Sequence, residues 1–323
     1  MKIAFYTNLV HEGWSADSLE TGVGGSEEVL ILLSRELVKK GHQVTIFHNG
    51  KHGEFDGVKY EDHRQFSNFE GYDVFVAFKA PHILRETINA KRKFYFSVSS
   101  ENLPIWVVEA SEKIIGISDY HLSKITPSDA DKKRFYLFAD EKELVEAKDD
   151  RNSGTILYSS SFDRGLEDLL KDWSEIRRNN TDINELRIAY GWDFMDKGGA
   201  GSPDYAKWKN NMLELMRQPG ITYLGRLSRG DINREYWRAE YWALPLNNPD
   251  SELFCINAIK AQYCGAKPIV NKEGALVETV NQYVDYKEFV MGTSIDPNIL
   301  ANKQYTVGFL LEDAIERWLG IVG

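Results

Sequence analysis

The sequence has 323 residues, of which 42% are hydrophobic, and its net charge is −10. This length exceeds that of a usual single domain, and the apolar content suffices for two cores, so two domains are expected. The acidic balance argues against nucleic acid as a partner, because nucleic-acid-binding surfaces are basic.

The remaining bulk features point to a cytoplasmic protein. The cysteines, Cys255 and Cys264, cannot form a disulfide framework, and free thiols suit a reducing compartment. No stretch has the length of a membrane span, and the first residues lack the apolar core of a signal peptide. Peripheral contact with an anionic membrane would require local clusters of basic residues.

The first part of the chain predicts the alternating strands and helices of a parallel sheet. A buried strand is expected at residues 2–7, followed by a helix with Ser26 as its N-cap that ends at Gly41. A strand at 42–47 completes a strand–helix–strand unit, which implies parallel strands. Further strands are expected at residues 73–78, 93–98 and 113–117, the last followed by a helix with Ser118 as its N-cap.

A charged stretch poor in apolar residues, 140–154, is the predicted linker. After it the alternation restarts, which favours a second doubly wound α/β domain. In such sheets ligands bind beyond the carboxyl ends of the strands, so a cleft between two domains is the expected site. The expected strands are 155–158, 185–190, 221–224, 241–246 and 267–270, and the expected helices are 165–178, 253–263 and one within 307–322.

A glycine-containing loop at residues 22–27 precedes the first predicted helix. Glycines let a ligand approach the backbone, and a helix N-terminus attracts anions. The spacing is not that of a dinucleotide-binding loop, which follows its strand through a tight turn, so an NAD site is not expected. A plain helix-capping turn is the alternative.

Two segments of the second half could bind a phosphorylated ligand. Residues 158–165 form a serine-rich turn with Arg164 near its end, and hydroxyls, helix N–H groups and a guanidinium suit a diphosphate. The alternative is a surface turn capped by Asp163. Glu252 stands just before a predicted helix, where its carboxylate can accept hydrogen bonds from sugar hydroxyls.

Lys260 lies eight residues after Glu252, which is about two helical turns, and so is expected near the same helix face. The alternative is a buried helix between strands with a solvated Lys260. Neither reading by itself identifies a reaction.

Taken together, these motifs resemble those of the GT-B glycosyltransferases, specifically the retaining GT4-like families (glycosyl transferases group 1). Each motif is weak alone, but their order and spacing are fairly specific. The matching pieces are Gly24-Gly25-Ser26-Glu27 with 40–45, Ser159 to Leu170 with Trp173 and Tyr190-Gly191-Trp192, Gly225-Arg226-Leu227, Glu252 to Gly265, and 274–279.

The resemblance implies a GT-B fold, with two doubly wound Rossmann-like domains that face each other across a cleft. Residues 1–147 would form the acceptor-side domain and 148–304 the nucleotide-sugar donor domain. A C-terminal helix in 305–323 would pack back on the first domain.

The resemblance also implies a retaining, metal-independent hexosyltransferase-like enzyme of glycan biosynthesis. Its donor would be a UDP- or GDP-sugar, its acceptor a glycan, a lipid-linked molecule or a small molecule with a hydroxyl group, and it would need no cofactor. Asp129 and Asp131 form a D-x-D pattern in a polar run, and a turn separates His48 from His52, so neither pair predicts a metal site.

Roles for single residues follow from the resemblance. Arg164 would contact the donor diphosphate, Glu252 the donor sugar, and Gly225 and Arg226 the nucleotide base. Backbone N–H groups of Phe254 and Cys255 would meet the phosphate, and Gly24 and Gly25 would face donor and acceptor. The predicted donor-binding set is Gly24, Gly25, Ser159, Arg164, Gly191, Gly225, Arg226, Glu252, Leu253, Phe254, Cys255 and Lys260, of which Arg164, Glu252 and Lys260 are the predicted catalytic residues.

The sequence departs from the family pattern at three places. The second glutamate of the E-x7-E motif is Lys260, and the basic phosphate position five residues before Arg164 is Ser159. Where relatives often carry a histidine after the fourth N-terminal strand, this chain reads 97–102 as Ser-Val-Ser-Ser-Glu-Asn. Lys260 and the missing histidine keep one alternative open, a catalytically impaired nucleotide- or sugar-binding relative. A GT-B sugar epimerase, which shares the architecture but not this motif set, is a further alternative.

Overall fold

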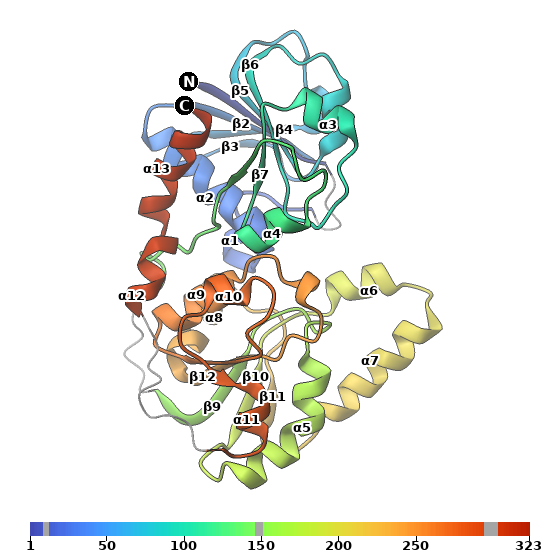
Figure 1. Cartoon of the computed structure of the whole chain (residues 1–323), viewed down its shortest axis with the longest axis vertical. Coiled ribbons are helices and arrows are strands. Elements are labelled where there is room, and N and C mark those ends of the chain that lie inside the picture. Colours follow the sequence, from blue (N-terminus) through green and yellow to red (C-terminus); the bar gives the residue numbers. More distant parts are fainter. Residues whose placement is uncertain (9–12, 146–150, 294–302) are drawn as a thin grey trace. The chain divides into compact units, whose positions relative to one another are not determined.

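The computed structural model describes residues 1–8, 13–145, 151–293 and 303–323 (Figure 1). These residues form two compact units. The first unit comprises Met1–Leu19, Val23–Asp140 and Phe309–Gly323, and the second comprises Glu20–Gly22 and Glu141–Gly308. The domain limits at 147/148 and 304/305 remain predictions.

The first unit is built on a sheet whose described strands follow the order β3-β4-β2-β1-β5-β6-β7-β8. Neighbouring strands are parallel except β3 and β4, which form an antiparallel hairpin. The five strands expected from the sequence are confirmed. The strands are β1 Lys2–Tyr6, β2 Gln43–His48, β3 Gly53–Phe55, β4 Val58–Asp62, β5 Tyr72–Phe78, β6 Ala90–Phe96, β7 Lys113–Gly116 and β8 Lys132–Arg134.

The helices of the first unit differ from the prediction mainly at their ends. The prediction of Ser26 as the N-cap of α2 is wrong. The helix begins at Gly25 with Gly24 as its N-cap, and the Ser26 hydroxyl, already inside the helix, donates to the Glu27 carboxylate. The prediction for Ser118 is confirmed, since its side chain accepts a hydrogen bond from the His121 N–H. The helices are α1 Ser18–Thr21, which continues into the second unit, α2 Gly25–Lys39, η1 His63–Gln65, η2 Pro81–Arg85, α3 Ile105–Ala110, α4 Asp119–Lys124, η4 Val307–Phe309, which ends in this unit, and α13 Leu311–Val322.

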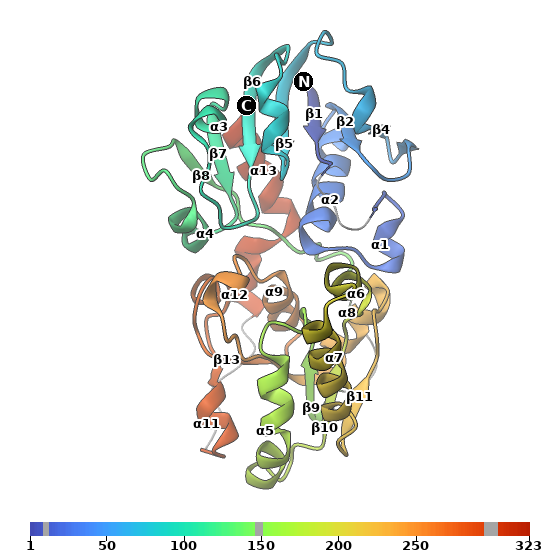
Figure 2. The same cartoon turned by 90° about the vertical axis from the view of Figure 1, so that its right-hand side faces the viewer.

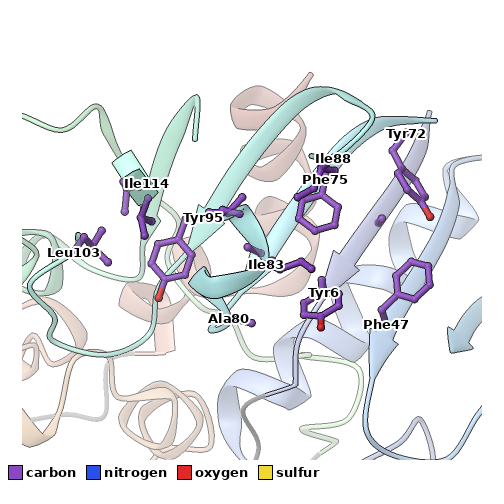
Figure 3. Packing of buried hydrophobic residues seen from close by; sticks show 14 of the residues in the cluster. Tyr6, Phe47, Tyr72, Phe75, Ala80, Ile83, Ile88, Tyr95, Leu103 and Ile114 are labelled. Atoms are coloured by element: carbon purple, nitrogen blue, oxygen red, sulfur yellow. The ribbon is translucent and has the colours of Figure 1, made fainter. Parts of the chain in front are cut away.

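Both faces of the first sheet are covered, as expected for parallel strands. Alternate side chains of β1 point to opposite faces. Ala4 and Tyr6 join the buried cluster of Figure 3, which also contains Ile83 of η2 and Tyr95 of β6. Phe5 points to the other face, where α2 and α13 pack together (Figure 1).

Trp318 holds the last helix of the chain, α13, within the first unit. Its side chain is fully buried, and its ring centroid lies 5.7 Å from Phe5, 5.9 Å from Phe96 and 5.2 Å from Phe135. Aromatic pairs at such distances add stabilisation beyond that of the buried area. Residues from both ends of the chain therefore share one core.

The change Trp318→Ala is predicted to lower the free energy of unfolding of the first unit by about 3–5 kcal/mol, because it leaves a large cavity among the three phenylalanines. Urea denaturation followed by circular dichroism measures this loss. Phe69→Ala is the control, since Phe69 is 93% exposed and should cost less than about 0.5 kcal/mol. Equal effects of the two changes would contradict the role given to Trp318.

The second unit contains a sheet whose described strands are all parallel, in the order β11-β10-β9-β12-β13-β14. Figure 2 shows β9, β10 and β11 beside one another. Helix α7 packs against α5. The strands are β9 Asn152–Tyr158, β10 Glu185–Ile188, β11 Ile221–Tyr223, β12 Ala239–Leu244, β13 Lys267–Val270 and β14 Val284–Asp285. The helices are α5 Leu166–Asn179, α6 Asp193–Gly199, α7 Pro203–Leu215, α8 Arg229–Arg238, η3 Pro249–Ser251, α9 Ile256–Tyr263, α10 Leu276–Thr279, α11 Tyr286–Val290 and α12 Lys303–Thr306.

Two boundaries of this unit correct the sequence analysis. The predicted linker 140–154 overlaps β9, which begins at Asn152 because Asn152 pairs with Ala239 and the Gly154 N–H donates to the Glu240 carboxylate at 2.8 Å. Residues 146–150 of that linker lie outside the described residues. The helix expected from Leu253 begins only at Ile256, after a buried, non-helical stretch.

The order of strands in the second sheet creates a point where the chain reverses direction. The chain runs from β9 outward to β10 and β11, and then returns to β12 on the other side of β9. The loops that follow β9 and β12 therefore leave the sheet next to each other and diverge. Ligands of open parallel sheets bind at such a switch point, beyond the carboxyl ends of the strands. No helix of the described part of the chain is both long and apolar enough to cross a bilayer.

Candidate functional site

The loop after β9 is held against the loop after β12 by a close approach of the two backbones. Gly165 has φ +89°, and a Cβ atom at this position would collide with the carbonyl oxygen of Pro245, so only glycine fits. The Tyr158 hydroxyl donates to the carbonyl oxygen of Ser161 at 2.6 Å and so fixes the start of the same loop. These contacts position Arg164.

Arg164 and Glu252 form an ion pair at the switch point. Nη1 of Arg164 donates to Oε2 of Glu252 at 2.8 Å. Glu252 is only 5% exposed, whereas 34% of the Arg164 side chain remains open to solvent. The pair thus combines a buried carboxylate with a guanidinium that a ligand can still reach.

The electrostatics of the pair follow from burial and proximity. Burial raises the pKa of Glu252, while Arg164 and hydrogen bonds from the Phe254 N–H and the Cys255 thiol oppose that rise. The neighbouring carboxylate of Glu252 raises the pKa of Arg164 further above its already high value. The guanidinium therefore keeps its positive charge, which suits it to bind an anionic group.

Arg226, Gly191 and Gly225 come together at the carboxyl ends of β10 and β11. The Arg226 side chain lies so close to Gly191 that a Cβ atom there would be 3.0 Å from the Cβ of Arg226. Nη2 of Arg226 donates to the carbonyl oxygen of Gly22 at 3.0 Å. Gly225 has φ +69° and open space beside it, as a turn with an accessible backbone requires.

An aromatic cluster at the same edge of the sheet was not foreseen as part of the site. The Phe162 ring lies 4.4 Å from Trp192 and 5.3 Å from Tyr190, between centroids, and 6.2 Å from Tyr223. Tyr190 and Trp192 flank Gly191, and this tripeptide is one of the pieces that resemble the family. The sequence could therefore have indicated that Tyr190 and Trp192 lie at the site. The serine-rich turn gave no corresponding hint for Phe162.

Ser159 lies in a hydrogen-bond network inside the second unit. Its hydroxyl oxygen accepts from Trp242 Nε1 at 3.0 Å and lies 3.2 Å from the Tyr236 hydroxyl. Tyr236 donates to Asn257 Oδ1 at 2.8 Å, so Ser159 must donate to Tyr236, and the Asn257 amide closes the ring on the Ser159 carbonyl. Because its hydroxyl hydrogen is already engaged, this arrangement does not favour the predicted phosphate contact of Ser159.

The change Ser159→Ala is predicted to lower the free energy of unfolding by about 1–3 kcal/mol, because it leaves the buried Trp242 N–H without an acceptor. Affinity for a nucleotide-sugar should stay unchanged. Thermal unfolding and isothermal titration calorimetry measure the two quantities, with Ser153→Ala at an exposed position as the control. A loss of ligand affinity without loss of stability would restore the phosphate role of Ser159.

Lys260 is buried in α9, with 6% of its surface exposed. Glu252 is not part of that helix but has extended backbone angles, four residues before Ile256. The eight residues from Glu252 to Lys260 therefore do not form two helical turns. The prediction that both side chains lie on one helix face is wrong. The contact of Lys260 with a donor stays a prediction, as does that of Leu253, which is buried in the intervening segment.

Gly24 and Gly25 belong to the first unit, where they begin α2. The buried Glu27 carboxylate lies over Gly24 and forms an ion pair with Lys79, which follows β5 in a left-handed conformation with φ +59°. Burial alone would raise the pKa of Glu27, but Lys79 and the local hydrogen bonds lower it below its usual value. The carboxylate of Glu27 therefore supplies a negative charge at the N-terminus of α2, where the helix dipole favours one.

The described histidine and acidic side chains do not form a metal site. The rings of His48 and His52 lie 5.8 Å apart, and burial lowers the pKa of His48 to about 4. Among the residues that the structure describes, no three histidine, cysteine, aspartate or glutamate side chains gather closely enough to hold a metal ion.

The family model described as glycosyl transferases group 1 matches residues 140–305, just over half of the chain. The chain belongs to the group 1 glycosyl transferases. No curated protein sequence matches this glycosyltransferase significantly.

Solved structures share its fold over nearly the whole chain. Sucrose-phosphate synthase from Thermosynechococcus elongatus has 12% sequence identity and a TM-score of 0.74, with 99% of this chain and 98% of that chain covered. HepE from Anabaena, solved in complex with UDP-glucose, has 14% identity and a TM-score of 0.68, with coverage of 100% and 99%. A UDP-forming trehalose-phosphate synthase from Burkholderia vietnamiensis has 8% identity and a TM-score of 0.71, with coverage of 99% and 96%. The predicted GT-B fold, of α/β class, is thereby confirmed.

Proposed function

We propose that this glycosyltransferase transfers a hexosyl group from a nucleotide-sugar to a hydroxyl group of a glycan, a lipid-linked molecule or a small molecule. The observation that carries the proposal is the ion pair of Arg164 and Glu252 at the switch point of the second sheet. It sets a cation, suited to a diphosphate, beside a carboxylate suited to sugar hydroxyls. A UDP- or GDP-sugar is the proposed donor.

The proposed reaction retains the anomeric configuration. The acceptor oxygen forms a bond to the anomeric carbon on the face from which the diphosphate departs. The bond from that carbon to the phosphate oxygen breaks, the nucleoside diphosphate leaves with the electron pair, and the acceptor proton passes to a departing phosphate oxygen. Negative charge therefore grows on the leaving group as the transition state forms.

Arg164 is the proposed stabiliser of that charge, together with Lys260, and neither a metal ion nor another cofactor is required in this proposal. Glu252 would hold the donor sugar, and the N–H groups of Phe254 and Cys255 would bind phosphate. Gly191, Gly225 and Arg226, beside the aromatic cluster of Phe162, would receive the nucleotide base. We also propose a cytoplasmic location, because both cysteines are free thiols.

The change Arg164→Ala is predicted to weaken donor binding by about 1.5–3 kcal/mol, the usual contribution of a hydrogen bond to a charged group. This corresponds to a loss of roughly 10- to 150-fold in affinity. Isothermal titration with UDP-glucose and GDP-mannose measures it, repeated with EDTA to test metal independence. Arg178→Ala on the exposed side of α5 is the matched control. An unchanged affinity of the Arg164 variant would refute its assignment.

The change Lys260→Glu tests the second proposed cation. If the Lys260 ammonium binds the donor diphosphate or ribose, the substituted carboxylate repels the phosphates, and donor affinity should fall by roughly tenfold or more. Lys260→Arg, which keeps the charge, should retain more of the affinity. Equal or tighter binding by Lys260→Glu would show that Lys260 is a degenerate motif position and not a ligand.

The buried lysine in place of a motif glutamate also favours a second candidate function, a binding protein that has lost turnover. Tight binding of a nucleotide-sugar without hydrolysis or transfer would support that alternative. Interconversion of free nucleotide-sugar epimers would instead indicate an epimerase. Binding of no nucleotide at all would exclude each of these functions.

A further inference from the structure

The loop after β9 is tied at two points to the segment that enters α9. Arg164, near the end of the loop, forms the ion pair with Glu252. Near the start of the loop, the backbone carbonyl of Ser159 accepts a hydrogen bond at 2.5 Å from Nδ2 of Asn257, the second residue of α9. Residue 159 thus pairs with 257, and residue 164 with 252. The two segments therefore lie side by side and run in opposite directions.

The orientation of the Asn257 amide follows from its two partners. A carbonyl oxygen can only accept a hydrogen bond, so the group that faces the Ser159 carbonyl is the amide nitrogen. The amide oxygen then faces Tyr236 of α8, whose hydroxyl donates to it at 2.8 Å. Tyr236 is only 1% exposed. A buried donor and a backbone acceptor therefore hold Asn257 in one direction.

The groups proposed to bind the donor diphosphate lie between these two ties. Cys255, whose N–H group is a proposed phosphate ligand, stands two residues before Asn257. Arg164 presents its guanidinium from the facing loop. One diphosphate can contact both groups only if the two segments keep a fixed separation. A displacement of about 1 Å in such a positioned group can cost about 100-fold in activity.

The two ties respond differently to a bound anion. The ion pair uses the guanidinium that the diphosphate would itself contact, and 34% of the Arg164 side chain is open to solvent. A bound diphosphate therefore competes with Glu252 for Arg164. The tie at Asn257 joins an uncharged amide to the backbone carbonyl of Ser159, a residue that is 6% exposed. An anion has no cation to compete for there, so this tie keeps the separation while the donor is bound.

We infer that Asn257 is a positioning residue for the donor diphosphate. Its amide holds the loop of Arg164 at a fixed distance from the N-terminus of α9, so that the guanidinium and the backbone N–H groups contact the same phosphates. Asn257 itself makes no contact with the donor. The inference rests on the proposed function, since it concerns the donor of that reaction. Pre-organisation of this kind raises affinity, because the two segments need not be ordered when the ligand binds.

The change Asn257→Ala removes the tie and keeps Arg164 and Glu252. Asn257 is partly exposed and lies in a helix, where alanine is favourable, so the variant should fold. Isothermal titration with UDP and with GDP, well below the melting temperature of every variant, measures affinity. Whichever diphosphate the wild-type protein binds should bind about tenfold more weakly to Asn257→Ala. Asn210→Ala, at an exposed position of α7, is the matched control and should bind as the wild-type protein does.

Two comparisons separate positioning from a purely structural role. Ser159→Ala removes the hydroxyl but keeps the carbonyl that accepts from Asn257, so it should lower the melting temperature and leave diphosphate affinity unchanged. If Asn257 only stabilised the fold, the affinities of the two variants would instead follow their melting temperatures. In an Arg164→Ala background, the change Asn257→Ala should cost less than roughly threefold in affinity, because no guanidinium remains to be positioned.

Two results would overturn the inference while the proposed function stands. One is an affinity of Asn257→Ala for the diphosphate equal to that of the wild-type protein. The other is a loss of the same size with and without Arg164, because the two residues would then act independently. Failure of the proposed function would look different, since the wild-type protein would bind neither UDP, GDP nor their sugars. That result would overturn both conclusions together.

Discussion

The carboxyl group of Glu252 is almost completely buried, and the opposite charge of Arg164 beside it offsets part of the cost of burying its ionised form. Removing a charge from water is costly unless it is paired and hydrogen-bonded, and the pair meets both conditions. Its existence depends on the reversal of the chain between β9 and β12, which brings the two loops together. The glycine at position 165 then allows the backbones to touch, so the fold and the proposed donor chemistry share one constraint.

In each unit, the polar side chains of the candidate sites lie at the carboxyl ends of parallel strands. In the first unit these are Glu27 and Lys79, which form an ion pair. In the second unit they are the pair of Arg164 and Glu252 and the contact of Arg226 with Gly191. This placement is consistent with the way open parallel sheets bind ligands.

The pattern of apolar residues predicted most of the strands, because buried parallel strands are short continuous apolar runs. It missed the hairpin of β3 and β4, although Asp56 and Gly57 form its turn and both have positive φ. It also began α9 too early, since periodicity cannot distinguish a buried irregular segment such as 253–255 from a helix. The hydrogen-bond network around Ser159 could not be predicted either, because its partners Tyr236, Trp242 and Asn257 come from distant parts of the chain.

The sequence by itself determined most of the buried strands, the family, and the residue types at the proposed site, because these depend on local pattern and on motif spacing. The tertiary structure decided which of those side chains meet. It paired Arg164 with Glu252, drew Ser159 into the core, and brought Trp318 from the end of the chain against Phe5 near its start. Contacts of this kind depend on strand order and on the direction of each side chain, and neither is encoded in the spacing of residues along the chain.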